Sequence, residues 1–217
     1  SHFEFGPTPG SGPHGEADVI AVTERCPLGD QGILTPFGVS KAAADLYCQQ
    51  YSRLYGLDIV ILRPGCFTGP HSLAVVAQNF LPPLVRAMVR GETYTVYGHQ
   101  GKQVRDVLHV EDLARAVVIC AVAQAEDLET GYQISAAWRG DVFNCGGGPA
   151  NTISILEAVD LVHEFTGKRG ELRFADKRPG DWPWACFSNQ KIKAVRGWEP
   201  RIGIRELVRE LCEEATS

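Results

Sequence analysis

The chain has 217 residues, of which 44% are hydrophobic and 22% are charged, the composition of an ordinary globular protein. Its formal net charge of −5 offers none of the basic surplus that nucleic-acid-binding proteins usually carry, and no apolar stretch approaches the roughly 20 residues that span a bilayer. Seven cysteines without a CxxC pair argue against a zinc cluster or a disulfide framework, and the first residues lack a signal-peptide pattern, so we expect a cytoplasmic protein.

The first predicted elements are a loop, a helix and a strand. Residues 1–36 are rich in Gly and Pro, which predicts a loop, and an Ala-rich helix is expected over residues 38–55. Gly56 would end this helix, because glycine adopts the left-handed conformation readily. The apolar run at residues 58–63 then predicts a strand buried on both faces. This succession is typical of a doubly wound parallel sheet, with the strand at a central position.

The rest of the chain continues the alternation of helices and strands. We expect helices over about 78–90, 112–125, 151–167, 189–198 and 202–215, and strands over about 93–98, 104–110, 141–145 and 171–175. The fold class is therefore α/β, the C-terminal part of a Rossmann-type doubly wound parallel sheet with a smaller substrate-binding lobe. Residues 1–150 would form the partial Rossmann-like core, with residues 68–100 contributing to the lobe, and residues 151–217 would form the lobe.

A cluster of three glycines occupies residues 146–148, between a predicted strand and a predicted helix. A phosphate-binding turn would lie at such a place, where a helix begins. The cluster lacks the GxGxxG spacing and the downstream acid of a dinucleotide site, which favours a tight structural turn. A GxxGxxG fingerprint before the first helix is absent.

Phe37 and Lys41 lie four positions apart at the start of the first predicted helix, so their side chains share a face. With the Ala-rich helix behind it, the segment resembles the YxxxK pair of the extended short-chain dehydrogenase/reductase family, with Phe37 in the place of Tyr. In that family the Lys holds the nicotinamide ribose and lowers the pKa of the Tyr, which moves protons as general acid and base. The resemblance implies catalytic positions at Lys41 and Phe37, but Phe has no proton to give.

A second motif, RPGCFTGP at residues 63–70, resembles the loop of this family where cofactor and nucleotide sugar meet. The resemblance implies that NAD is the cofactor. By the same resemblance the cofactor-binding positions are Lys41, Arg63, Pro64, Gly65 and Cys66, and two of the substrate-binding positions are Thr68 and Asn79.

A third motif, residues 101–117, resembles the RDxxHVxD segment of the family, in which the Arg reaches the nucleotide diphosphate. Arg105 is the candidate, because the guanidinium fork can bind two phosphate oxygens at once. Asp112 is assigned to structure, since a carboxylate stabilises the positive end of a helix. His109 is a possible catalytic base, but its place at the end of a strand favours a packing role.

A fourth motif, ADKRPGDW at residues 175–182, resembles the family's RxGD element. Arg178 would approach the diphosphate or the nucleoside, and Asp181 would contact a ribose hydroxyl or Arg178 itself. Ser1 stands five residues before Gly6, the spacing of the family's active-site Ser or Thr, and is a weaker catalytic candidate.

The resemblance covers residues 23–214 and is greatest to the CDP-paratose (CDP-tyvelose) 2-epimerase group, which implies an NAD-dependent epimerase acting on a nucleotide-diphosphate sugar. A 4,6-dehydratase or reductase of the same superfamily is an alternative, although its Asp-Glu pair is missing from the stretch before Phe37. A third hypothesis is a non-catalytic sugar-nucleotide-binding remnant. The family also implies a homodimer, which would form through the helices at 38–55 and about 77–90.

Overall fold

The computed structural model describes residues 21–26, 28, 35–72, 79–129, 140–178 and 181–217. Ser1 and most of the predicted opening loop lie outside these residues. Within them, two groups of helices and strands pack around separate hydrophobic cores and meet at one strand, β4 (Val104–His109).

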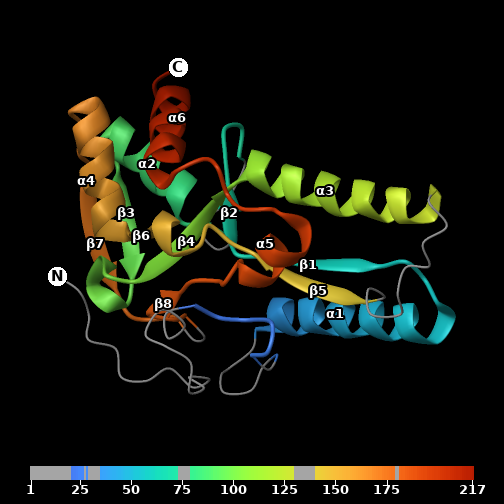
Figure 1. The fold of residues 1–217 in the computed structure, drawn as a ribbon. Helices are drawn as coiled ribbons and strands as arrows, with labels where there is room; N and C mark the ends of the chain where they lie inside the picture. Colours follow the sequence, from blue (N-terminus) through green and yellow to red (C-terminus); the bar gives the residue numbers. More distant parts are fainter. Residues whose placement is uncertain (1–20, 27, 29–34, 73–78, 130–139, 179–180) are drawn as a thin grey trace.

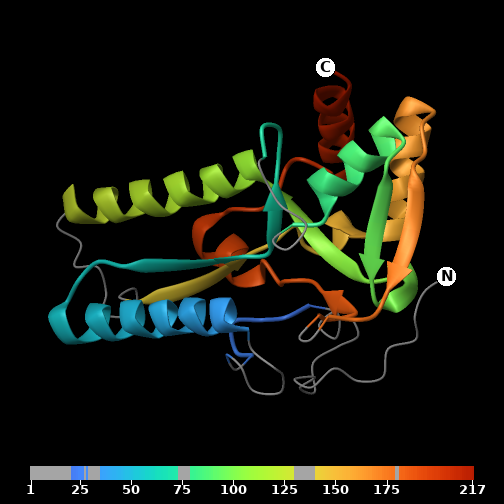
Figure 2. The same ribbon diagram turned by 180° about the vertical axis from the view of Figure 1, so that it is seen from behind.

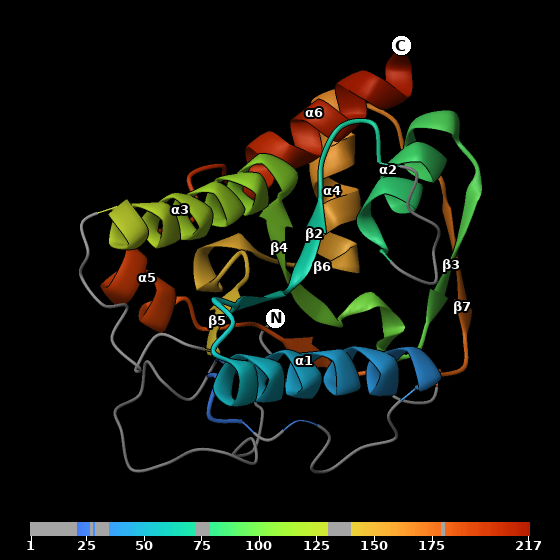
Figure 3. The same ribbon diagram turned by 90° about the vertical axis from the view of Figure 1, so that its right-hand side faces the viewer.

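The first group is a parallel strand pair covered by helices on both sides. It contains α1 (Pro36–Tyr55), β1 (Val60–Pro64), α3 (Val110–Glu129), β5 (Asp141–Cys145) and α5 (Gln190–Arg196). Strands β1 and β5 run parallel, and α1 and α3 lie on opposite sides of the pair (Figures 1 and 3). The predicted helix and parallel strand are confirmed, as is the end of α1 at Gly56, whose φ is 66°. Thr35 caps the start of α1 by accepting a hydrogen bond from the backbone N–H of Gly38.

The expected central position of the strand at 58–63 is wrong for the described part of the chain. There β1 pairs with β5 alone, so β1 is an edge strand. Its apolar residues Val60, Ile61 and Leu62 are half-buried instead of buried on both faces. The apolar run does form a strand, but among the described residues a partner strand lies along only one of the two edges of β1.

The second group is built on three packed helices. It contains α2 (Leu81–Arg90), β3 (Thr93–Tyr97), α4 (Ile155–Thr166), β7 (Glu171–Ala175) and α6 (Ile204–Thr216). Helices α2, α4 and α6 pack against one another, and β3 lies beside β7 in a parallel pair (Figure 2). Seven of the ten residues of α2 are buried in this core. The prediction that the helix at 77–90 forms a dimer surface is therefore wrong, because its apolar face is used inside the chain.

A mixed sheet joins the two groups. It contains β2 (Cys66–Thr68), β4 (Val104–His109), β6 (Thr152–Ser154) and β8 (Trp184–Ala185), and the short helical turns η1 (His99–Gly101) and η2 (Pro149–Asn151) lead into β4 and β6. The second half of β4 pairs with β2, and its first half pairs with β6 and β8. Consecutive residues of β4 enter different cores: Val107 belongs to the α2–α4–α6 core, and Leu108 to the core around Phe143.

Helix α4 begins later than the sequence predicts. Residues 152–154 form β6, and Ser154 is the N-cap, accepting from the backbone N–H of Glu157 while the Glu157 carboxylate accepts from the N–H of Ser154. This reciprocal capping satisfies two amides that would otherwise lack partners, so it fixes the start of α4 at Ile155.

Candidate substrate site

A cavity of about 520 Å³ lies between the two groups of elements. Its walls come from the end of β1, the start of α2, β3, the first part of β4, and the segments around residues 178–187. A cavity of this size is in the range of small-molecule binding sites. Seven residues that the sequence singled out line it: Pro64, Gly65, Cys66, Asn79, Arg105, Arg178 and Asp181.

The two candidate arginines meet in this cavity, although they lie on segments far apart in the chain. Arg105 donates from Nη2 to Oδ1 of Asp181 at 2.6 Å and from Nη1 to the carbonyl of Val104 at 2.7 Å. Arg178 lies flat against Tyr97, with its guanidinium carbon 3.7 Å from the ring centroid. Asp181 was expected on a ribose hydroxyl or on Arg178, and the structure places it on Arg105 instead.

One wall of the cavity contains neutral polar groups that are hydrogen-bonded to one another. The Cys66 thiol donates to Oδ1 of Asn79 at 3.5 Å, and Nδ2 of Asn79 donates to the carbonyl of Phe67 at 2.8 Å. Burial raises the pKa of the Cys66 thiol to about 12, and burial likewise raises the pKa of Tyr94 to about 12. At neutral pH both groups therefore stay protonated and can serve only as hydrogen-bonding groups.

Two other sequence candidates lie outside the cavity lining. Arg63 forms a two-pronged ion pair with Asp45 of α1, at 2.7 and 3.0 Å. Burial opposes ionisation of this carboxyl, but hydrogen bonds from Arg63 and Gln49 hold the pKa of Asp45 below its ordinary value. Through this ion pair Arg63 fixes α1 to the strand that leads to the cavity. Thr68 is buried on β2, and its hydroxyl has no hydrogen-bond partner among the described residues.

The pair at the start of α1 has the geometry that its spacing predicts. The Nζ of Lys41 lies 5.4 Å from the centre of the Phe37 ring, and Phe37 is 66% exposed. Thr35, the cap of the same helix, lines the cavity. Phe37 and Lys41 therefore lie in the first two turns of α1, next to the edge of the cavity that Thr35 forms.

The sequence matches a family model described as the NAD dependent epimerase/dehydratase family over residues 10–146, more than half of the chain. The chain belongs to this family.

Two curated relatives illustrate the range of the epimerase/dehydratase family that this chain resembles. It is 28% identical to CDP-paratose 2-epimerase of Salmonella typhi, over 84% of this chain and 52% of the relative. It is 25% identical to dTDP-glucose 4,6-dehydratase 1 of Escherichia coli strain K12, over 90% of this chain and 52% of the relative. The chain thus spans about half the length of the curated relatives it matches.

Solved structures of the family share the fold. MoeE5 in complex with UDP-glucuronic acid and NAD superimposes with a TM-score of 0.71 at 28% identity, covering 91% of this chain and 60% of that one. UDP-glucose 4-epimerase of Thermotoga maritima with UDP-glucose gives a TM-score of 0.64 at 26% identity, covering 83% and 53%. These Rossmann-fold neighbours confirm the predicted fold class. Within the described residues, no helix has the length and apolarity to cross a membrane.

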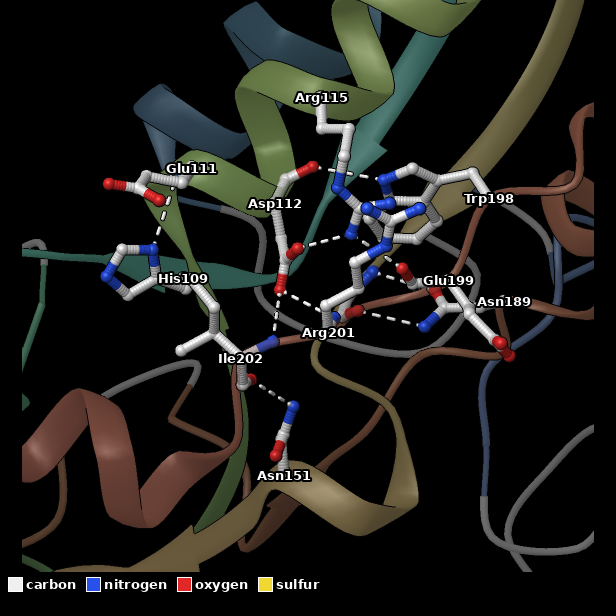
Figure 4. A network of polar contacts seen from close by, with 11 residues as sticks. His109, Glu111, Asp112, Arg115, Asn151, Asn189, Trp198, Glu199, Arg201 and Ile202 are labelled. Carbon is white, nitrogen blue, oxygen red and sulfur yellow. Dashed lines mark hydrogen bonds and ion pairs between the residues drawn. The ribbon is translucent and has the colours of Figure 1, made fainter.

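His109 and Asp112 lie between the two cores of this epimerase/dehydratase family member. Both form hydrogen bonds to other parts of the protein. His109 is buried, accepts at Nδ1 from the N–H of Glu111, and has Nε2 2.9 Å from Glu210 of α6. The carboxylate of Asp112 accepts from the backbone N–H groups of Arg201 and Ile202, both at 2.9 Å (Figure 4). These contacts support the packing and structural roles assigned from the sequence.

The same hydrogen-bond network includes the buried indole of Trp198. The indole N–H donates to the backbone carbonyl of Asp112 at 3.0 Å, and Arg115 binds both the Asp112 carboxylate and the carbonyl of Glu199 (Figure 4). The start of α3 is thereby tied to the segment that leads into α6.

The sequence reasoning missed three residues of the site. Tyr97 supplies the ring under Arg178, Phe187 forms part of the cavity wall, and Asp106 lies buried behind that wall. Asp106 carried a usable signal, because a carboxylate inside an apolar strand must find partners in the folded chain. Tyr97 and Phe187 carried none, since exposed and cavity-lining aromatic residues have no distinct sequence pattern.

The burial of Asp106 leads us to expect an unusual pH dependence of the free energy of unfolding. Burial raises its pKa from 3.8 to about 6, against the opposing effects of the N–H groups of Phe187 and Gly148 and the charge of Arg105. Between about pH 4 and 6 the folded chain therefore binds more protons than the unfolded chain, so the free energy of unfolding falls as pH rises, by up to about 3 kcal/mol in total. We expect Asp106→Asn to remove this fall, as measured by urea denaturation at pH 4.5 and 7.0.

Groups with lowered pKa do not mask this effect. Asp45 and Asp112 lose their stabilising charge only as pH falls below their ordinary value of 3.8. Glu164 and Glu199, whose ordinary value is 4.5, are exposed and are present in both proteins, so they cancel when the slope of Asp106→Asn is subtracted. Equal slopes for the unmodified chain and Asp106→Asn would contradict the prediction.

Proposed function

We propose that this chain is the substrate-binding part of an NAD-dependent epimerase that acts on a nucleotide-diphosphate sugar, in the manner of the CDP-paratose 2-epimerase group. The observation that carries the proposal is the meeting of Arg105 and Arg178 in one cavity. A diphosphate carries two negative charges and many acceptor oxygens, and charge-assisted contacts from guanidinium groups are the usual means of binding it. The resemblance to epimerases and dehydratases that bind nucleotide sugars supports the same substrate class.

We assign separate tasks to the lining residues. Arg105 and Arg178 would bind the diphosphate, and the stacked pair of Arg178 with Tyr97 offers a flat surface to the nucleoside. Asp181 would exchange Arg105 for a ribose hydroxyl when the diphosphate binds. Asn79 would orient the sugar through its remaining amide hydrogen, while Thr68 supports the wall from behind.

The residues near α1 suit the cofactor that the family implies. Lys41 is exposed and forms no ion pair within the described residues, so its ammonium is available to a ribose hydroxyl. Pro64, Gly65 and Cys66 would form the cofactor-side wall, held in place by the Arg63–Asp45 ion pair. NAD, when bound, would accept a hydride from the sugar and return it. Ser1, which lies outside the described residues, would assist at the reacting carbon.

Phe37 favours a second candidate function, a protein that binds nucleotide sugars without converting them. The aromatic ring gives no proton at the place where the family uses a Tyr hydroxyl. The NAD content of the purified protein separates the two functions, because a non-catalytic remnant should carry none. A 4,6-dehydratase remains a further alternative, since dehydratases are among the relatives.

The remaining features of the proposal concern organisation. Residues 1–150 would form a partial Rossmann-like core, and residues 151–217, joined by residues 68–100, would form the substrate-binding lobe. The exposed apolar residues of α1, including Leu46, Tyr47, Tyr51 and Leu54, offer a surface for a homodimer. We place the protein in the cytoplasm.

The proposal is tested by direct binding. We expect Arg105→Ala and Arg178→Ala each to weaken the binding of a nucleotide-diphosphate sugar by about tenfold to a hundredfold, because each removes a charge-assisted contact worth roughly 1.5–3 kcal/mol. Isothermal titration calorimetry with CDP-glucose, UDP-glucose and dTDP-glucose measures the affinities and identifies the base. Arg169→Ala is the matched control, since Arg169 is an exposed arginine paired with Asp160 away from the cavity. Unchanged affinity in both cavity variants would remove the main support for the proposal.

A further inference from the structure

Asp106 is a buried carboxylate that the proposed reaction does not use. It is 1% exposed and follows Arg105 directly on β4, so the two side chains leave the strand on opposite faces. Arg105 lines the cavity, whereas Asp106 points away from it into the protein. Burying a charge is costly unless hydrogen bonds compensate for it, so the partners of this carboxylate need an explanation.

Both of its hydrogen-bond partners are backbone amides from other segments. Oδ2 of Asp106 accepts from the N–H of Gly148, which follows β5, and from the N–H of Phe187, which follows β8, each at 3.1 Å. Oδ1 is buried and has no partner among the described residues. One oxygen therefore joins two segments, the turn between β5 and β6 and the segment that follows β8.

The carboxylate packs closely against two neighbouring glycines. A Cβ at Gly146 would lie 2.2 Å from Oδ2 of Asp106, and a Cβ at Gly65 would lie 3.1 Å from Oδ1. The N–H of Gly146 is itself used by Oδ1 of Asn189, at 2.9 Å. The glycine cluster at 146–148 thus receives an anion at one amide, that of Gly148, and the anion is the side chain of Asp106, which supports the structural-turn interpretation over a phosphate-binding turn.

Two of the residues that touch Asp106, Phe187 and Gly65, form part of the cavity wall. We infer that Asp106 is a positioning residue, which holds the Phe187 and Gly148 loops against β4 and so sets the shape of the cavity in which Arg105 acts. The inference rests on the proposed function, because it concerns the same cavity and the same nucleotide-diphosphate ligand.

The test compares two buried carboxylates, Asp106 and Asp112, that each accept hydrogen bonds from two backbone N–H groups. Asp112 also accepts from two backbone N–H groups, those of Arg201 and Ile202, but neither partner lines the cavity. Asp106→Ala and Asp112→Ala each remove the acceptor of two backbone N–H groups. We expect Asp106→Ala to weaken binding of the nucleotide sugar by roughly tenfold, because a displaced wall misplaces the groups that contact the ligand, and Asp112→Ala to leave it unchanged.

A conservative variant separates positioning from packing. Asp106→Asn keeps a carbonyl oxygen for both N–H groups, so we expect an affinity within about threefold of the unmodified chain. Calorimetry is carried out at a temperature where each variant is folded by circular dichroism, with UDP-glucose, CDP-glucose and dTDP-glucose as probes. If Asp106→Ala does not fold, Asp106→Ser replaces it, since it also removes the oxygen that reaches the two N–H groups but keeps a polar side chain on the strand. Equal affinity in Asp106→Ala, or an equal loss in Asp112→Ala, would overturn the inference while leaving the proposed function intact.

A readout without ligand covers the case in which the unmodified chain binds none of the probes and the proposed function fails. Amide hydrogen exchange measured by NMR should accelerate at Gly148 and Phe187 in Asp106→Ala and stay unchanged there in Asp112→Ala. That result would support Asp106 as the link between the two loops. Unchanged exchange at both amides would overturn it.

Discussion

Replacing Asp112 with alanine should lower the free energy of unfolding by about 3 kcal/mol. The carboxylate is buried, and its loss leaves the N–H groups of Arg201 and Ile202 without acceptors, each at a cost of roughly 1–3 kcal/mol. Hydrogen bonds from Arg115 and from these amides hold the pKa of Asp112 below its ordinary value, although burial opposes them. The stabilising charge is therefore present above about pH 4 and is lost as pH falls further. Urea denaturation at pH 7 measures the change.

Arg115→Ala is the control for this prediction. The Arg115 side chain is partly exposed and can be replaced by water at the Asp112 carboxylate, so its removal should cost no more than about 1 kcal/mol. A loss below 1 kcal/mol for Asp112→Ala would show that the network in Figure 4 does not hold the segment before α6 in place.

Restoring a hydroxyl by Phe37→Tyr should raise turnover by about 10²–10⁴, the usual contribution of general acid–base catalysis. The ring at this position lies 5.4 Å from the ammonium of Lys41, which would favour the ionised phenol. Two groups of the cavity wall are poor bases, because burial keeps the Cys66 thiol and the Tyr94 phenol protonated at neutral pH. The assay follows interconversion of a nucleotide sugar by the chain extended with a cofactor-binding half.

Lys41 provides the control for this gain. Adding Lys41→Ala to Phe37→Tyr should abolish most of the increase, since the phenol then loses the charge that lowers its pKa. Turnover that is the same with Phe and with Tyr at position 37 would mean that the reaction uses another acid.

The alternation of apolar and glycine-rich segments was enough to predict the α/β fold and the order of its longer helices and strands, but not the short strands β2, β6 and β8. Local signals act within a few residues, and the end of α1 at Gly56 and the end of α2 at Gly91 follow from them. The start of α4 was misplaced because Ser154 competes with earlier polar residues for the capping position, and only the pairing of β6 with β4 decides between them.

The candidate site was predictable where a motif fixes a charged residue on the end of an element. Arg105 and Arg178 were found in this way, and both line the cavity. The ion pair of Arg63 with Asp45 and the identity of the two amides that bind Asp106 depend on contacts between distant segments, which one sequence does not reveal. The same holds for α2, whose apolar face suits a dimer surface or an internal core equally well until its neighbours are known.

The three pairings of β4 also set the order in which the chain can fold. Its partners span from Cys66 to Ala185, so the strand cannot be completed until nearly the whole chain has left the ribosome. Contacts of such long sequence separation close slowly. Because Val107 and Leu108 belong to different cores, loss of β4 opens both at once. The two cores should therefore melt in one cooperative transition, and a fragment that ends before residue 184 should fail to fold.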